Sequence, residues 1–295
     1  MKHFPTLSLV AALGIGSGML ASGAANAYTL YDITGFEDDN LEYLIDSGTG
    51  GTAGVLDVGD KLRGVIEWTK IYEIGGTGEQ DPPAPDLTGI FELQVYSKAA
   101  TGGGLFTFVF GPSAAFQSVY GPGAMVAIYT DDQAVPTDLN VVPPNCGSIA
   151  ACESISTDGS LWLVAGFADP DDLWVTTNAR DDLGVVAGLP ASTKVALNNY
   201  YLSILVNNTG SDFAQQSVAR VIPGTPPCAG FLGAGDCMVD VIGSGDSLGG
   251  QGLSNGYTVR SDIDAQIAFI PEPGTLALLG LGLAGLGSIR RRKTT

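Results

Sequence analysis

The stretch that most limits the fold lies just before the C-terminal tail, at Gly256 to Ile270, where apolar and polar side chains alternate. One face carries Tyr257, Val259, Ile263, Ala265, Ile267 and Phe269, and the other carries Thr258, Arg260, Asp262, Asp264 and Gln266. A period of two is typical of a half-buried β-strand. Asn255-Gly256, directly before it, is a turn signal of β-hairpins.

The same alternation recurs along the chain. Further strands are expected at 61–71, 91–95, 106–110, 124–130, 161–166, 173–177, 200–206 and 218–222. The only helix expected is a short acidic one at Glu37 to Leu44, since no long stretch keeps a period of 3.6. Long Gly- and Pro-rich loops are expected at 75–86, 131–146, 223–236 and 243–255. This pattern predicts an all-β fold, an antiparallel β-sandwich.

The three tryptophans are assigned from the same alternation. Trp68 and Trp162 are expected in the core, because burying an indole ring is strongly stabilising. Trp174 lies on the face opposite Leu173 and Val175 and is expected to be the exposed one. Exposed tryptophans can stack on sugars, so this residue is a candidate for carbohydrate contact.

Both ends of the chain are excluded from the folded body. Residues 1–27 have a basic start, an apolar middle from Leu7 to Leu20 and the small-residue site Ala25-Asn26-Ala27, which is typical of a secretory signal peptide. The mature chain then begins near Tyr28, and residues 28–270 form one extracellular domain. Export follows from this signal.

The tail, residues 271–295, has three parts in a fixed order. Pro271, Glu272 and Pro273 come first, an apolar run at 275–289 follows, and Arg290, Arg291, Arg292 and Lys293 close it. The run would make a helix of roughly 22 Å, shorter than the roughly 30 Å hydrocarbon core. A single membrane helix is expected, with the arginines as its stop-transfer anchor and the body outside.

This order of elements resembles the PEP-CTERM sorting signal of Gram-negative bacteria. The resemblance implies that Pro271, Glu272 and Pro273 are recognised by a membrane enzyme, exosortase, which removes the tail after transient membrane anchoring. It also implies a cell-surface or extracellular place and a role near exopolysaccharide and other matrix components. The resemblance covers about 25 of the 295 residues. The alternative is an ordinary single-pass anchor.

Charge and histidine content limit the chemistry of the body. The chain has a net charge of −18, and the body alone, with 8 basic and 30 acidic residues, is near −22. Nucleic acid and anionic membranes are repelled by such a surface. The one histidine, His3, lies in the signal peptide, so histidine-based nucleophile systems and histidine-ligated zinc are excluded. We therefore expect no enzymatic activity.

Carboxylate chemistry supplies the alternative function, a secreted hydrolase. A glycosidase needs two carboxyl groups at a set separation, and the sequence does not select a pair. Asp46-Ser47-Gly48-Thr49-Gly50 resembles the active-site element of aspartic proteases, in which two such aspartates share a proton. This chain has one copy, which reads equally well as a turn. A third reading is a structural subunit that self-assembles through an edge strand.

Acidic pairs in loops suggest calcium, which prefers six to eight oxygen ligands. The best candidate site is Asp169, Asp171 and Asp172, in a turn between two expected strands. Surface charge that discourages aggregation explains the same residues. No other cofactor is expected.

Four cysteines, an even number in an exported chain, predict two disulfides. Three connectivities exist. We favour Cys146–Cys152 and Cys228–Cys237, because each pair would close one loop that follows two prolines. A four-cysteine metal site would need tighter spacings.

Overall fold

The computed structural model describes residues 33–48, 54–74, 79–80, 87–102, 104–130, 139–141, 143–178, 194–218, 238–249, 253 and 255–270. Its strands are β1 Ile33–Ile45, β2 Lys61–Glu73, β3 Glu79–Gln80, β4 Leu87–Gly102, β5 Leu105–Pro112, β6 Ala124–Thr130, β7 Ser160–Gly166, β8 Leu173–Asn178, β9 Lys194–Asn207, β10 Asp212–Ala214, β11 Gln216–Ser217, β12 Met238–Val239, β13 Val241–Gly249 and β14 Val259–Ile270. Its helices are α1 Ala114–Tyr120 and α2 Ile149–Ser156.

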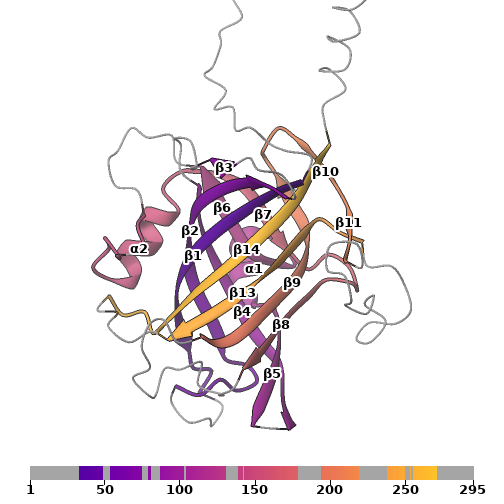
Figure 1. The fold of residues 1–295 in the computed structure, drawn as a ribbon. Coiled ribbons are helices and arrows are strands. Elements are labelled where there is room, and N and C mark those ends of the chain that lie inside the picture. The colour runs from indigo at the N-terminus through magenta and orange to yellow at the C-terminus, as the bar shows by residue number, and fades with distance from the viewer. Residues whose placement is uncertain are drawn as a thin grey trace, which may run out of the picture.

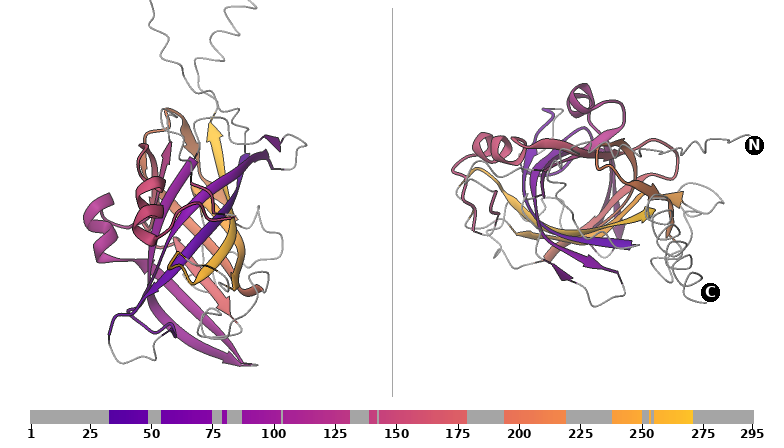
Figure 2. Two further views of the ribbon diagram at one scale, coloured as in Figure 1. Left: turned by 90° about the vertical axis from the view of Figure 1, so that its left-hand side faces the viewer. Right: turned by 90° about the horizontal axis from the view of Figure 1, so that it is seen from above.

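The strands form a closed antiparallel barrel, visible end-on in Figure 2. The order along the sheet runs β2-β1-β14-β13-β9-β7-β6-β4, and β4 pairs back with β2 to close the ring of eight. The chain reaches this closure through pairs far apart in sequence, such as Phe36 opposite Ala265. A closed barrel leaves no free edge along the ring, which removes the usual route to edge-to-edge aggregation.

Strands β4 and β9 are long, and each pairs with two different strands along one edge, so the ring contains different strands at its two ends (Figure 1). One edge of β4 pairs with β6 at residues 87–91 and with β5 at residues 93–102. One edge of β9 pairs with β8 at residues 196–201 and with β7 at residues 203–207. The β6–β7 pair therefore completes the ring of eight at one end, and the β5–β8 pair completes it at the other.

The prediction of a β-sandwich is wrong, because the sheet closes on itself as a barrel. The strands at 61–71, 124–130, 161–166, 173–177 and 200–206 are present, with ends that move by a few residues. Their alternation suits the inner face of a barrel as well as the inner face of a sandwich, because both have a period of two. The deciding pairs, β2 with β4 and β9 with both β7 and β8, are not encoded in any local pattern.

The two helices lie outside the barrel, where they cover parts of its outer surface (Figure 2). Phe116 of α1 packs against Ile90, Ala127 and Val164 of the barrel strands. The segment that includes α2 covers Leu41 and Val65. Both helices begin at a serine cap, Ser113 and Ser148, and each cap hydroxyl accepts a backbone hydrogen bond. Within the described residues, neither helix has the length and apolar character needed to cross a membrane.

Two further expectations are wrong. Residues Glu37 to Leu44 form strand β1 rather than an acidic helix. Two of their carboxylates are buried inside the barrel, which a sequence reading of clustered acids as surface does not anticipate. The expected loop at 243–255 begins as strand β13, in which Gly243 leaves room for the Tyr200 ring and Gly245 lies close to the backbone of Asp262 and Ile263.

Trp174 also differs from its prediction. It is 5% exposed and points into the barrel, while Leu173 packs against an outer cluster of Tyr201, Val218 and Ile242. Apolar side chains therefore cover both Trp174 and Leu173, which lie on opposite faces of β8. For this reason the apolar pair Leu173 and Val175 does not show which face of the strand points into the barrel. Trp68 and Trp162 are buried as expected.

Candidate functional site: a cavity inside the barrel

A cavity of about 40 Å³ lies in the middle of the barrel. Nine strands contribute to its wall, which makes it a feature of the closed ring rather than of any one hairpin. The wall is apolar over most of its area. Its carboxyl and amide side chains come from one strand, β1, which contributes Asp38 and Asn40.

The polar side of the cavity belongs to a chain of hydrogen bonds between β1 and β14. Asp38 Oδ1 accepts a bond from the Asn40 amide at 3.0 Å and from the Ile263 backbone N–H at 2.7 Å. The same Asn40 amide donates to the Ser261 hydroxyl at 3.1 Å. The Ser261 hydroxyl donates in turn to Glu42. The four side chains are each at most 5% exposed, so this is an internal polar ladder.

The ladder holds two carboxyl groups that burial keeps from ionising easily. Burial raises the pKa of Asp38 well above its usual range, although the Ile263 N–H opposes this and the nearby Asp264 and Asp262 reinforce it. Burial also raises the pKa of Glu42 to about 7, against the lowering effect of the Ser261 hydroxyl. No cation pairs with either group within the described residues. Desolvation of an unpaired carboxylate accounts for both shifts.

The facing side of the cavity is aromatic. Trp174 stacks on Tyr200, with ring centroids 4.5 Å apart, and on Phe91 at 6.4 Å. Trp68 lies opposite Asp38 in the β1–β2 register and packs on Phe36 with centroids 4.7 Å apart. Stacked rings of this kind add stability beyond their buried area.

Two polar atoms of the wall have no hydrogen-bond partner among the described residues. They are Asn40 Oδ1 and Trp68 Nε1, from side chains that are 2% and 6% exposed. Buried polar groups in proteins are nearly always bonded to protein or to water. The side chains of the wall therefore include one acceptor and one donor that have no partner among the described residues.

The size of the cavity restricts its chemistry. A water molecule needs about 10–15 Å³ of cavity volume, so a cavity of 40 Å³ holds about three or four waters. A sugar ring or a peptide segment does not fit. A hydrolytic site between Asp38 and Glu42 would also need room for a substrate, and Asn40 and Ser261 fill the space between these two carboxyls.

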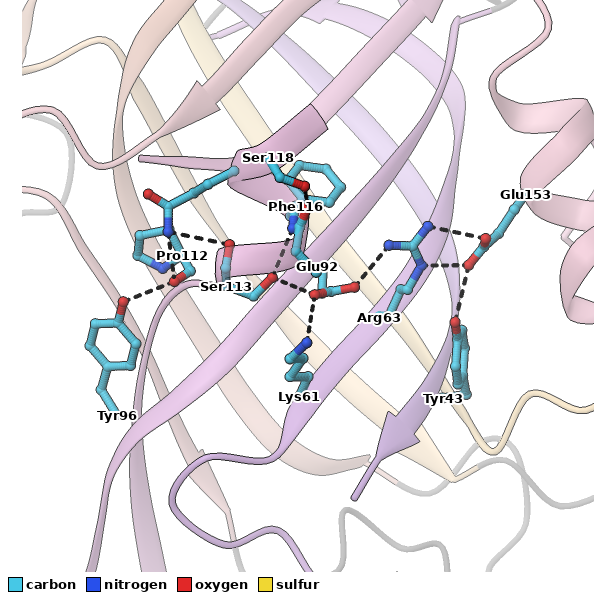
Figure 3. A network of polar contacts seen from close by, with 12 residues as sticks. Tyr43, Lys61, Arg63, Glu92, Tyr96, Pro112, Ser113, Phe116, Ser118 and Glu153 are labelled. Carbon is cyan, nitrogen blue, oxygen red and sulfur yellow. Dashed lines mark hydrogen bonds and ion pairs between the residues drawn. The ribbon is translucent and has the colours of Figure 1, made fainter. Parts of the chain in front are cut away.

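A second polar network lies on the outer surface and ties both helices to the barrel (Figure 3). Arg63 binds Glu153 of α2 with two bonds, at 2.6 and 3.1 Å, and binds Glu92 at 2.8 Å. Ser113, the cap of α1, also donates to Glu92. Burial alone would raise the pKa of Glu92, but Ser113, Arg63 and Lys61 together hold it below its usual value. Every charge here is paired, so the network is structural.

The tail follows the barrel without a spacer. Strand β14 ends at Ile270, and residues 269–293 match the PEP-CTERM protein-sorting motif. The chain carries a PEP-CTERM sorting signal. It is accordingly exported, sorted to the cell envelope and processed by an exosortase-type enzyme. No curated protein matches the chain.

Several residues that the sequence singles out lie outside the described part of the chain. They are the signal peptide, the sorting residues Pro271, Glu272 and Pro273, the apolar run at 275–289, the anchor residues Arg290, Arg291 and Arg292, and the cysteines Cys228 and Cys237. Cys146 and Cys152 are described. They lie at disulfide distance, with Cα atoms 5.1 Å apart, and the bond closes the turn that leads into α2.

The carboxylates of the candidate calcium ligands accept hydrogen bonds from their own loop and from neighbouring residues. Asp172 Oδ2 accepts from the backbone of Ala168 and Asp169 and from the Ser203 hydroxyl. Asp171 accepts from the Met238 backbone, and its hydrogen bond with Asp169 raises the Asp169 pKa to about 6. In the described parts of the chain, no three Asp, Glu, Cys or His side chains are grouped as metal ligands. A calcium site here stays a prediction.

The protease-like element behaves as a turn in its described part. Asp46 is exposed and accepts a bond from the Gly48 backbone at 2.7 Å, two residues on. The Ser47 backbone donates to Asp60, a buried residue that also accepts from Asp57. Such bonds are those of an ordinary Asx turn.

The cavity and its polar ladder are not anticipated by the sequence. Nothing local separates Asp38 and Glu42 from the many surface acids, and nothing singles out Asn40 or Ser261. A signal is present in the spacing, since Asp38, Asn40 and Glu42 alternate along one face of a strand. That spacing has meaning only once the segment is known to be a strand.

Proposed function

We propose that this chain is a non-enzymatic protein of the extracellular matrix, delivered to the outside of the cell by its sorting signal and associated there with exopolysaccharide. The observation that carries the proposal is the sorting motif at residues 269–293. The strongly acidic body, near −22, adds support, because high net charge keeps a secreted protein soluble.

The position of the motif relative to the barrel fits release of a complete folded body. Strand β14 pairs with β1 on one edge and with β13 on the other, so the ring is closed by Ile270. Removal of residues after Pro273 would break no strand pair of the barrel. The released product would then keep its full stability.

Intact-mass measurement tests the delivery step. The protein is recovered from its native host, separately from membranes and from medium. We expect a species in the medium that begins at Tyr28 and ends near Pro273. Recovery only of a membrane species that retains residues 290–295 would contradict the processing step and remove the support for a matrix role.

Co-sedimentation tests the matrix step. The purified protein is mixed with exopolysaccharide from the host, with calcium and with a chelator. Because an acidic body and an acidic polysaccharide repel each other, we expect binding to depend on a divalent cation. Protein that stays in the supernatant with and without calcium would contradict the matrix role.

The second candidate is a carboxylate hydrolase, which the two buried carboxyls Asp38 and Glu42 favour. The small cavity and the side chains between the two groups weigh against it. An activity found on polysaccharide or peptide substrates and lost in Glu42→Gln would make this the leading function.

A further inference from the structure

The charge of the cavity wall is entirely acidic. Asp38 is the one carboxyl side chain of the described wall, and the described wall contains no Lys, Arg or His. Both hydrogen bonds that Asp38 accepts go to Oδ1, so Oδ2 makes none with the described residues. An anion would meet a carboxyl group without any compensating cation and would be excluded.

A ligand that both donates and accepts hydrogen bonds would satisfy the unpartnered atoms of the wall. Asn40 Oδ1 and Trp68 Nε1 are buried without a partner, and Asp38 Oδ2 accepts no bond from the described residues. A purely apolar molecule would leave all three unsatisfied, at a cost of hydrogen-bonding free energy for each. An apolar ligand is therefore a poor fit.

The aromatic side favours a cation. Trp68, Trp174 and Tyr200 line the same cavity as Asp38, and Trp68 sits directly across the strand pair from it. A positive charge is attracted to the face of an aromatic ring, most strongly when water is excluded. A carboxyl group and several aromatic side chains around one small space form a suitable environment for an ammonium group.

We propose that the barrel cavity binds a small organic ammonium ion of at most about four non-hydrogen atoms. Its N–H groups bond Asp38 and Asn40, its alkyl part lies against Trp68 and Trp174, and a hydroxyl on the ligand accepts from Trp68 Nε1. The size limit follows from the volume of 40 Å³. This inference goes beyond the proposed matrix role and does not depend on it.

The probes are chosen to separate charge from size. Ethanolamine and methylammonium are the test ligands, ethylene glycol is the neutral match of ethanolamine, and acetate is the anionic match. Binding to the purified protein is followed by tryptophan fluorescence and by the indole N–H signals in NMR, at constant ionic strength. Few ligand atoms limit the affinity, so we expect dissociation constants of about 0.1–10 mM for the two ammonium ions.

Two variants locate the site. Asp38→Asn keeps an acceptor for the Ile263 N–H and removes the carboxyl group, whose ionised form a bound cation favours, so we expect at least a tenfold weaker binding of ethanolamine. Asp212→Asn is the matched control, because Asp212 is exposed and is not part of the wall. We expect its affinity to stay within twofold of the wild type.

A third variant covers the case in which Asp38→Asn does not fold. Ala165 is a buried wall residue, and Ala165→Leu would fill the cavity with a larger apolar side chain. We expect it to fold and to lose binding. Three results would overturn the proposal: no saturable signal up to about 50 mM, as for a cavity that holds only ordered water; equal affinity for ethylene glycol and ethanolamine; or unchanged binding in a folded variant of Asp38 or Ala165.

Discussion

Gly243 faces Tyr200 across the β13–β9 pair, and the Tyr200 ring occupies the space where a side chain at 243 would lie. A Cβ at this position would be 1.9 Å from Tyr200 Cζ. The glycine thus lets the ring lie flat inside the barrel, where it stacks on Trp174 and lines the cavity. Two residues 43 positions apart in the sequence fix one wall of the candidate site.

The first prediction concerns this contact. Gly243→Ala should destabilise the protein by about 1–3 kcal/mol, because the extra methyl group forces the buried ring out of place. Urea denaturation followed by circular dichroism measures the change. Gly147→Ala is the control, since no atom lies within 4 Å of a Cβ there and the residue is exposed. Equal stability of both variants would contradict the assigned packing.

The second prediction concerns the outer network of Arg63. Arg63→Ala removes two bonds to Glu153 and one to Glu92, which is only 3% exposed. We expect a loss of about 1–3 kcal/mol, since a buried carboxylate loses a partner while Lys61 at 3.3 Å compensates in part. Thermal or urea unfolding gives the value. Arg63→Lys should recover less than half, because a lysine does not bind a carboxylate with two parallel bonds.

A surface ion pair serves as the reference for that experiment. Lys70 and Glu37 lie 3.8 Å apart and are 38% and 45% exposed. Solvent screening makes such pairs weak, so Lys70→Ala should cost about 0.5 kcal/mol or less. If Lys70→Ala cost as much as Arg63→Ala, the assignment of Arg63 as the link between α2 and the barrel would fail.

The third prediction is a pH dependence of stability. Burial gives Glu42 a pKa of about 7 in the folded protein, against 4.5 in its usual state. Between these values the folded chain keeps a proton that the unfolded chain has lost, so stability falls as pH rises from about 4.5 to 7. The shift corresponds to roughly 3 kcal/mol. Asp264, with a pKa raised to about 6, acts in the same direction.

Denaturation midpoints at pH 4.5 and 7.5 test this dependence. The wild type should be more stable at the lower pH. Glu42→Gln resembles the protonated form, keeps a partner for Ser261 and should show a clearly smaller difference between the two values. Glu73→Gln, at an exposed position, should behave as the wild type does. An unchanged difference in Glu42→Gln would show that another group controls the titration.

The fourth prediction concerns the Cys146–Cys152 pair. The bond joins Cys146, before α2, to Cys152 within α2, at a sequence separation of 6. Replacing both cysteines with serine should cost about 2 kcal/mol, because the unfolded chain regains the freedom that the loop removes. The comparison is between the double variant and the wild type in urea without reductant. A difference below about 0.5 kcal/mol would indicate that the pair is reduced in the native protein.

The alternation of apolar and polar residues is enough to locate most of the strands. Strand β14 has the inner face that its sequence predicts, with Val259, Ile263, Ala265, Ile267 and Phe269 all buried. The same reasoning fails on β8, because Leu173, on the face opposite Trp174, is also covered by an outer cluster. Alternation identifies two faces of a strand, and the direction of the core follows only when one face meets water.

The sequence by itself determined the all-β class, the order of most strands, the close spacing of Cys146 and Cys152, and the sorting signal of the tail, since each depends on residues close together in the chain. The tertiary structure alone decided that the sheet closes, that Gly243 belongs to a strand, and that Asp38, Asn40 and Glu42 lie inside. These outcomes depend on pairs such as Asp38 with Ile263, which are 225 residues apart. Local periodicity carries no information about partners at that distance, and only the packing of the whole ring selects them.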